Sequence, residues 1–357
     1  METGGGHMGK KEEILSLIRQ NAYYSQQELA DLVGLSRSAC AGYISQLMRD
    51  GEILGKAYVL KEEKRVCCIG GANLDRKMTV EAFRWKDSNP VTSHESFGGV
   101  ARNLAENMHV LGLHSQLMTV LGSDEAAGRL TADCRADTSL VQILPQERTG
   151  TYTAVMESSG EMLFALADMA IYDAWTPAVY RAQKHRTAAA DVLVLDTNLP
   201  QETMKEILSS KLPHQKAVIV PVSAAKISRI PQESIQDIDL LLLNELEAEA
   251  MAAHLGNEAD ELEARAANIV QAGAGMVIVT RGAEGVYMAS EEETAYIEAE
   301  EVKAVDVTGA GDAFASVCID GLLHDEEPKV WIKRALARAA ATIQSTESVI
   351  RTQEGKR

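Results

Sequence analysis

The chain has 357 residues, which is long for one small domain and fits two. Hydrophobic residues make up 46%, an ordinary share for a globular protein, so an intrinsically disordered chain is excluded. With 52 acidic and 35 basic residues the net charge is -17, a field that repels nucleic acid and anionic membranes, so any contact with DNA must be local.

The N-terminal sequence METGGGHMG, residues 1–9, is rich in glycine and resembles an expression tag, so it is expected to be disordered. It lacks the apolar region of a secretory signal, and no run of eighteen apolar residues occurs that would cross a membrane. The five cysteines form no C-x-x-C pair, and their odd number argues against a disulfide framework. These features predict a cytoplasmic location and no membrane partner.

Residues 10–60 predict three short helices followed by a β-hairpin. The second helix is expected to begin at Ser25, because Glu28 follows three residues later and completes a capping box. The segment 52–60 is β-prone and completes the unit.

The string S-Q-Q-E-L-A-D-L-V-G-L-S-R-S-A-C-A-G-Y-I-S-Q-L in this segment resembles the winged helix-turn-helix of bacterial regulators. In that family the third helix enters the major groove of DNA. The resemblance implies a DNA operator as partner and DNA contacts from Ser36, Arg37, Ser38, Tyr43 and, on the wing, Lys56. Residues 1–60 hold six basic and seven acidic residues, so a strong electrostatic footprint for DNA is missing. The alternative is a three-helix docking or dimerisation module.

A charged linker, residues 61–65, leads to a larger region, 66–350, in which short apolar runs alternate with helical patterns. Continuous apolar strands between helices favour an α/β fold with a mostly parallel sheet and helices on both faces. Such sheets bind ligands beyond the carboxyl ends of their strands. The expected strands are Val66–Ile69, Leu117–Leu121, Val192–Leu195, Ala217–Val220, Leu240–Leu243 and Met276–Thr280.

Two segments, 76–97 and 149–168, alternate apolar and polar residues. This period of two predicts antiparallel strands exposed on one face, which would form a small β flap, or lid, over the sheet. Apolar side chains on the exposed face, such as Val155, Leu163 and Leu166, call for cover. We therefore expect the flap to close over substrate and to pair with a second flap in a homodimer.

The strongest chemical signal is Asp306–Phe314, D-V-T-G-A-G-D-A-F. Gly309, Ala310 and Gly311 are small, so consecutive backbone N–H groups can converge on one anion at the start of the helix that follows. Asp312 lies in the first turn of that helix. A carboxylate beside an anion cradle fits a general base for a hydroxyl that attacks the γ-phosphate. The alternative is an ordinary acidic residue at a helix N-terminus.

This string resembles the signature of the PfkB-type, or ribokinase-like, carbohydrate and nucleoside kinases. The second family signature is present as F-G-G-V-A-R-N-L at Phe97–Leu104, and the resemblance covers about residues 65–345. The string differs from a Walker A motif, because no G-K-[ST] follows the glycines. The resemblance implies a ribokinase-like fold and a phosphotransferase that uses ATP and Mg²⁺.

The resemblance also assigns the acceptor side of the site. It implies that the backbone at Gly98 and Gly99 approaches the sugar and that Asn103 binds a sugar hydroxyl. Asp75, with Asn73 beside it, would accept hydrogen bonds from two vicinal hydroxyls, a task that suits a carboxylate. Without the resemblance, a plain glycine turn and a solvated loop aspartate are the alternatives.

The nucleotide side follows from two further strings. L-N-E-L-E resembles the N-x-x-E motif of the family, which implies that Asn244 and Glu247 organise Mg²⁺ and its waters; a helix cap explains both residues as well. T-R-G-A-E-G resembles the nucleotide-binding turn, and a glycine-dependent βα turn is its alternative. That turn comprises Thr280, Arg281, Gly282 and Gly285, with Arg281 toward phosphate. Asp306 and Thr308 fall where many relatives place a monovalent cation, which implies potassium.

Sequence strings on the substrate side limit the choice of acceptor substrate. Val100 stands where ribokinases of the family usually carry lysine, which argues against ribose. Five strings resemble pseudouridine kinases: D-S-N-P at 87–90, G-G-V-A-R-N at 98–103, G-E-M-L at 160–163, A-D-M at 167–169 and D-T-N-L at 196–199. The resemblance implies phosphorylation of the 5′-hydroxyl of a nucleoside, pseudouridine first, in a pocket that includes Asp168, Asn198, Thr149 and Thr151. The alternatives are another nucleoside or sugar, and a transcription regulator that uses a kinase fold as a ligand sensor.

Overall fold

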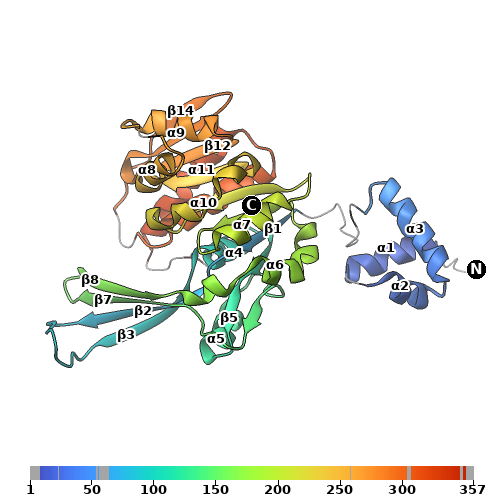
Figure 1. The fold of residues 1–357 in the computed structure, drawn as a ribbon, viewed down its shortest axis with the longest axis horizontal. Helices are drawn as coiled ribbons and strands as arrows, with labels where there is room; N and C mark the ends of the chain where they lie inside the picture. Colours follow the sequence, from blue (N-terminus) through green and yellow to red (C-terminus); the bar gives the residue numbers. More distant parts are fainter. Residues whose placement is uncertain are drawn as a thin grey trace, which may run out of the picture. The chain divides into compact units, whose positions relative to one another are not determined.

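The computed structural model describes residues 9–22, 24–53, 55, 64–257, 259–303, 307–345 and 349–350 (Figure 1). The chain divides into an N-terminal unit, which ends at Lys64 and also includes 184–189, and a larger unit that begins at Arg65. None of the described helices is long and apolar enough to span a bilayer. All five cysteines are free.

The N-terminal unit contains three helices, α1 (Lys10–Gln20), α2 (Gln26–Val33) and α3 (Arg37–Arg49). The predicted capping box is confirmed: the hydroxyl of Ser25 accepts the Glu28 N–H, and the Glu28 carboxylate accepts the Ser25 N–H. Leucine, isoleucine and valine side chains from all three helices form one buried cluster. Most of the predicted hairpin over 52–60, Lys56 included, lies outside the described residues.

The larger unit is built on an eight-stranded sheet in the order β14-β13-β12-β11-β10-β9-β1-β4. The strands from β12 to β4 run parallel, and β13 and β14 are antiparallel to their neighbours. The mostly parallel sheet predicted from the apolar runs is thus confirmed. In sequence order the strands are β1 (Arg65–Ile69), β4 (His114–Met118), β9 (Val192–Asp196), β10 (Lys216–Val220), β11 (Leu240–Asn244), β12 (Met276–Thr280), β13 (Val286–Ser290) and β14 (Thr294–Ile297).

One predicted strand is wrong in its extent. The apolar run 117–121 does not form a single strand, because β4 ends at Met118 and a separate short strand, β5 (Val120–Gly122), begins two residues later. β5 pairs with β6 (Gln142–Leu144) in a small sheet of its own. Apolar character alone cannot reveal such a change of partner.

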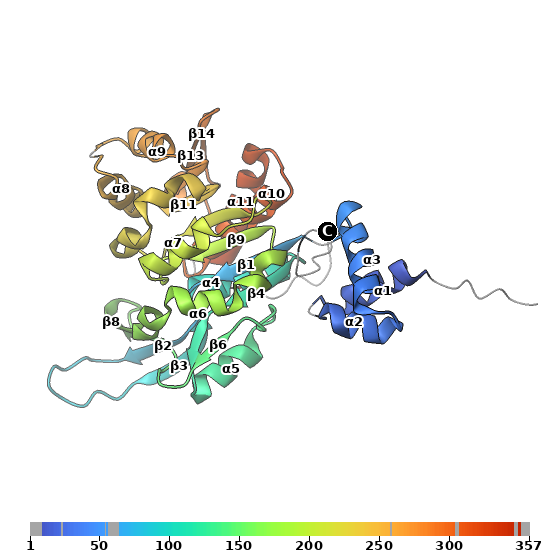
Figure 2. The same cartoon turned by 45° about the vertical axis from the view of Figure 1, so that its right-hand side comes forward.

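Helices cover both faces of the main sheet (Figure 2). Along β9 the alternate residues Leu193 and Leu195 join one buried cluster, whereas Val192 and Val194 join another. α7, α8 and α9 contribute to the first cluster, and α4, α10 and α11 to the second. The helices are α4 (Val100–Val110), α5 (Glu125–Asp133), α6 (Pro177–Gln183), α7 (Gln201–Ser209), α8 (Glu245–His254), α9 (Leu262–Gln271), α10 (Ala310–Leu323) and α11 (Pro328–Ile343).

Short 3₁₀ segments complete the unit. Three of them follow a strand after one to three residues: η1 (Ala170–Ala174) after β8, η3 (Ala224–Arg229) after β10 and η5 (Gly282–Glu284) after β12. The segment η4 (Gln232–Asp237) follows η3, and η2 (Lys184–Ala189) belongs to the N-terminal unit.

The predicted flap is a four-stranded sheet in the order β3-β2-β7-β8, whose strands extend together from the larger unit (Figure 1). It consists of β2 (Asn73–Val80), β3 (Thr92–Gly98), β7 (Thr151–Glu157) and β8 (Met162–Asp168). The prediction of purely antiparallel strands is wrong for its centre, since β2 and β7 pair in parallel. The flap consists of two antiparallel hairpins, β2–β3 and β7–β8. Both hairpins start from the same end of the flap, so their first strands, β2 and β7, run parallel.

Candidate active site

One buried carboxylate joins the backbone segments that carry the acceptor residues. Asp196, at the end of β9, accepts the N–H groups of Gly71 at 2.7 Å, Ala101 at 3.1 Å and Asn198 at 2.8 Å. Burial raises the pKa of Asp196, and these three hydrogen bonds oppose the shift. The loop after β1, the start of α4 and the loop after β9 are therefore held by a single side chain. The sequence contained this signal in D-T-N-L, but only Asn198 was singled out.

The glycine pair of the second signature allows a close approach of two strands. A Cβ atom at Gly98 would overlap the Asp75 carboxylate, and Gly99 has a φ of 99° at the N-cap of α4. The alternative of a plain glycine turn is therefore incomplete. Glycine at 98 lets the end of β3 lie against Asp75, and glycine at 99 lets α4 start beside the loop after β1.

Asp75 itself is a half-buried strand residue of the flap, which differs from the solvated loop aspartate that was the alternative. Its carboxylate accepts a hydrogen bond from the Asn73 amide. Burial raises the pKa of Asp75 to about 6, while Asn73 and the Arg102 guanidinium act in the opposite direction. A half-buried carboxylate with this environment gains from hydroxyl donors, because each new hydrogen bond favours the charged form.

The two family signatures meet in one hydrogen bond. The Asn103 amide nitrogen donates to Oδ2 of Asp312 at 2.9 Å, so α4 and the start of α10 lie together. Arg102 sets the orientation of that amide, since its guanidinium can only donate and contacts Asn103 Oδ1 at 3.3 Å. Arg102 is buried and is held in turn by Asp133 at 2.6 Å and the Phe97 carbonyl at 3.0 Å.

Asp312 has the properties of a general base. It lies in the first turn of α10, which begins after Gly309, a residue in the left-handed conformation at φ 80°. Burial raises the pKa of Asp312 to about 7, the Asn103 amide lowers it, and the charge of Asp196 raises it further. A base with a pKa near neutrality accepts a proton efficiently at physiological pH. The N–H groups of Gly309, Ala310 and Gly311 lie at the same helix start, where an anion is favoured, and that of Ala310 donates to the Val307 carbonyl at 3.4 Å.

On the nucleotide side, Asn244 and Glu247 form a reciprocal helix cap. Asn244 Oδ1 accepts the Glu247 N–H at 2.9 Å, and Glu247 Oε2 accepts the Asn244 N–H at 2.9 Å. Burial raises the pKa of Glu247. In the described parts of the chain no group of three or more His, Cys, Asp or Glu side chains could hold a metal by itself. One carboxylate and one amide oxygen fit Mg²⁺ that keeps most of its waters and binds phosphate.

The turn after β12 is shaped by glycine and by ion pairs. Gly282 and Gly285 have φ angles of 56° and 116°. Thr280 Oγ1 donates to the Leu243 carbonyl at 3.3 Å. Arg281 contacts Glu245 at 2.9 Å and Glu284 at 2.8 Å, so its charge is already paired with carboxylates.

The flap register separates the predicted substrate residues. Thr151 pairs with Leu74 and Asp168, whereas Asp75 pairs with Tyr152. Because paired residues share a face and successive residues alternate, Thr151 and Asp168 lie on the face opposite to Asp75. Tyr152, which sequence reasoning missed, shares the face of Asp75. Its signal was the period-two alternation within T-Y-T-A-V-M-E.

Three other predicted residues have clear placements. The Thr149 hydroxyl donates to Asp124 at 2.6 Å and accepts the Gly122 N–H at 3.1 Å, which gives it a structural partner on each side. Asn198 is buried at the end of β9. Thr308 is exposed, and Asp306 lies outside the described residues.

In the N-terminal unit Ser36, Arg37 and Ser38 are exposed at the start of α3. The Ser36 hydroxyl caps this helix by accepting the Ala39 N–H at 3.2 Å. Tyr43 is half-buried and packs against the helical core, so it points outward less than the sequence predicted.

Comparison with known proteins gives the same division of the chain. Residues 63–354 match the family model described as pfkB family carbohydrate kinase. The chain belongs to this family. Residues 9–53 of this pfkB-family chain match a second model, winged helix-turn-helix DNA-binding. Both resemblances identified in the sequence are thus confirmed.

Three relatives illustrate the likeness. An uncharacterized sugar kinase of Escherichia coli (strain K12) is 31% identical over 224 residues, which cover 61% of this chain and 62% of that protein, less than two thirds of its length. Pseudouridine kinase of the same strain is 32% identical over 273 residues, covering 74% of this chain and 86% of that protein. The ribokinase structure from Thermotoga maritima superimposes with a TM-score of 0.71 at 21% identity, covering 80% of this chain and 94% of that one. The last likeness confirms the ribokinase-like fold.

Proposed function

We propose that the protein is an ATP-dependent kinase that phosphorylates the 5′-hydroxyl of a nucleoside, with pseudouridine as the first candidate. The hydrogen bond between Asn103 and Asp312 carries the proposal. It joins a residue of the acceptor signature to a carboxylate whose pKa is about 7, beside a helix start suited to an anion.

In the proposed reaction Asp312 takes the proton of the acceptor hydroxyl, and the hydroxyl oxygen attacks the γ-phosphorus of ATP. The bond from that phosphorus to the bridging oxygen breaks, and its electron pair leaves with ADP. The backbone N–H groups at Gly309–Gly311 stabilise the charge on the transferred group. Asn244 and Glu247 would hold Mg²⁺, which neutralises phosphate charge when bound. Asp306 and Thr308, both part of the same signature, are the candidates for a potassium site.

The choice of a nucleoside rests on the substrate side. A relative named pseudouridine kinase is 32% identical, and the strings that resemble such kinases lie on the flap and on the loop after β9. Asp75, Asn73 and Asn103 supply carboxylate and amide groups for sugar hydroxyls. Another nucleoside or a sugar remains the alternative acceptor, because a few contacts decide between such substrates.

A panel experiment tests the proposal. ADP formation would be followed with ATP, Mg²⁺ and K⁺ against pseudouridine, the common nucleosides, ribose and fructose. We expect the highest kcat/KM with pseudouridine, and a kcat about 10²–10⁴-fold lower for Asp312→Asn with the same acceptor. A higher value for a free sugar would assign the alternative acceptor, and the absence of turnover with every compound would favour the sensor function. Omission of K⁺ tests the cation separately.

A second function, DNA binding, is proposed for the N-terminal unit. Exposed Arg37, Ser36 and Ser38 at the start of α3, together with the winged helix-turn-helix match over 9–53, support it. In this case binding of the substrate to the kinase unit would change the affinity of the N-terminal unit for its operator.

We also propose a homodimer formed through the flap and a cytoplasmic location. Met162 and Leu166 are 53% and 62% exposed, apolar surface on the flap strands that a second flap would cover, whereas Val155, which the sequence predicted to be exposed, is buried. The five free cysteines suit a reducing compartment. Sedimentation at micromolar concentration tests the dimer, and a strictly monomeric profile would refute it.

A further inference from the structure

The connection after β10 lies between the two halves of the site. In the sheet β10 is flanked by β9, whose end carries Asp196, and by β11, whose end carries Asn244. All three strands run parallel, so their carboxyl ends meet at one edge, with neighbouring strands about 4.8 Å apart. The connection after β10 therefore starts at this edge between the proposed acceptor side and the proposed nucleotide side.

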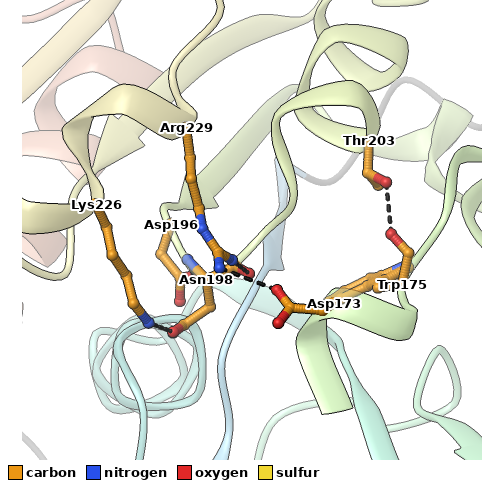
Figure 3. A network of polar contacts seen from close by, with 7 residues as sticks. All are labelled: Asp173, Trp175, Asp196, Asn198, Thr203, Lys226 and Arg229. Atoms are coloured by element: carbon orange, nitrogen blue, oxygen red, sulfur yellow. Dashed lines mark hydrogen bonds and ion pairs between the residues drawn. The ribbon is translucent and has the colours of Figure 1, made fainter. Parts of the chain in front are cut away.

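The connection is fixed to the acceptor loop by polar contacts (Figure 3). Lys226 Nζ donates to Oδ1 of Asn198 at 2.6 Å, and Arg229 donates to the Asn198 carbonyl at 2.7 Å. The Val222 N–H donates to the Thr197 hydroxyl at 2.9 Å. The 3₁₀ segment η3 also packs against α8, the helix that begins at the nucleotide side. The ammonium group of Lys226 is therefore held in a defined place between the two sides.

Among the residues that the structure describes, Lys226 lacks the carboxylate partner that the nearby arginines have. Arg102 contacts Asp133, Arg281 contacts Glu245 and Glu284, and Arg229 contacts Asp173 at 3.0 Å. The partner of Lys226 is a neutral amide, and within the described parts of the chain it has no ion pair. A half-buried ammonium beside a neutral group is unfavourable unless an anion completes its surroundings.

The Asp196 carboxylate acts electrostatically on both Lys226 and Asp312. Burial and the neighbouring Arg229 lower the pKa of Lys226, while Asp196 and Asp173 oppose the shift. Asp196 also raises the pKa of Asp312, so it lies within electrostatic reach of both groups. Asp196 is already bound by three backbone N–H groups, and Lys226 directs its hydrogen bond to Asn198 instead. Lys226 thus keeps N–H donors for a ligand.

We propose that Lys226 is a catalytic residue that binds the γ-phosphoryl group of ATP during its transfer. Lys226 stays protonated throughout, and the acceptor proton goes to Asp312. Two of its three N–H groups are available for phosphate oxygens while the third keeps its bond to Asn198. Since no lysine or arginine lies in the nine-residue signature, Lys226 provides the side-chain positive charge that a Walker lysine provides elsewhere. The inference rests on the proposed kinase function.

The test compares Lys226→Met and Lys226→Arg with Lys205→Met, which removes an exposed lysine of α7 that is paired with Glu233 of η4. We expect Lys226→Met to lower kcat by about 10²–10³-fold, the usual effect of removing one preorganised donor to a transition state. Lys226→Arg should recover part of this loss, and Lys205→Met should have wild-type kinetics.

A binding measurement separates this role from a structural one and from failure of the kinase proposal. Affinities for Mg²⁺ complexes of ADP and of a nonhydrolysable ATP analogue would be measured by calorimetry for all four proteins. Lys226→Met should weaken the analogue by about tenfold or more and leave ADP unchanged, since only the analogue has a γ-phosphate. The inference would be overturned if Lys226→Met lowered the affinities for both nucleotides equally or left both unchanged. It would also be overturned if this variant weakened binding of the acceptor alone. If the wild type turns over no acceptor, the kinase proposal fails, while the ratio of the two affinities still decides the role of Lys226.

Discussion

At the scale of single residues, the site depends on carboxylates whose protonation burial has altered. Asp312, Asp75 and Asp196 all have raised pKa values, and each accepts hydrogen bonds that favour the charged form. Groups with opposed contributions of this kind often mark a site that handles protons or anions. Asp196 holds three backbone segments, and we propose that Asp75 binds the acceptor and that Asp312 takes the proton of the reacting hydroxyl.

The pH dependence of the reaction follows from Asp312. Only its ionised form accepts a proton, and its pKa is about 7, so kcat/KM should fall as the pH drops below that value. Asp312→Asn should lower kcat by about 10²–10⁴-fold and abolish this limb of the profile. A pH series of kcat/KM for both proteins measures the effect. A variant that keeps near wild-type kcat would remove Asp312 from the mechanism.

The same shift has a consequence for stability. The pKa of Asp312 in the folded protein, about 7, lies above the ordinary value of an aspartate, 3.8, so the folded state holds more protons between these values. Stability contributed by this group is therefore present at low pH and is lost as the pH rises through that window. Asp312→Asn should gain thermal stability relative to the wild type as the pH rises from 4 to 8, as checked by calorimetry. A constant difference in Tm would show that the carboxylate is not strained in the fold.

At the scale of elements, the strand pairing of the flap decides which side chains share a face with Asp75. β2 and β7 pair in register, with Asp75 beside Tyr152 and Leu74 beside Thr151. A shift by one residue would exchange the two faces, so the pairing itself selects the pocket residues. The aromatic cluster of Phe83, Trp85 and Phe164 joins the loop between β2 and β3 to β8.

The register gives a direct test within one strand. Tyr152→Ala should raise KM for the acceptor several-fold and leave KM for ATP unchanged, because it removes a side chain from the face of Asp75. Thr151→Val, one residue away on the other face, is the matched control and should keep both values. Asp75→Ala serves as the positive reference for loss of acceptor binding. The reverse result for Tyr152 and Thr151 would assign the pocket to the opposite face.

At the scale of the whole molecule, two units with separate cores share one chain. The helical core of the N-terminal unit contains no residue of the larger unit, and all proposed catalytic residues lie beyond Arg65. Removal of residues 1–64 should therefore leave kcat and KM within about twofold of the full chain, as measured with the preferred acceptor. A loss of activity with retained folding would show that the N-terminal unit takes part in catalysis.

DNA binding by the full chain should be local and sensitive to salt. The net charge of -17 opposes association, so Arg37 and base contacts from α3 must provide the specificity. A mobility shift with DNA upstream of the protein's own gene should weaken steeply with salt and require Arg37, because phosphate contacts release counterions. A dimer would read two half-sites about 34–36 Å apart. If no fragment shifts at low salt, and Arg37→Ala changes nothing, the unit is a docking domain.

The local sequence determined the elements and the chemistry of the anion site. Apolar runs predicted the central strands, capping chemistry predicted the start of α2, and D-V-T-G-A-G-D placed Asp312 in the first turn of a helix. These features depend on residues that lie within a few positions of one another, so they can be predicted from the sequence alone. What depends on partners far along the chain was decided by the tertiary structure. The parallel pairing of β2 with β7 and the face shared by Asp75 and Tyr152 arise from strands about 75 residues apart. The contact of Lys226 with Asn198 and the binding of three segments by Asp196 arise in the same way, since no local pattern states which loops meet at the edge of a sheet.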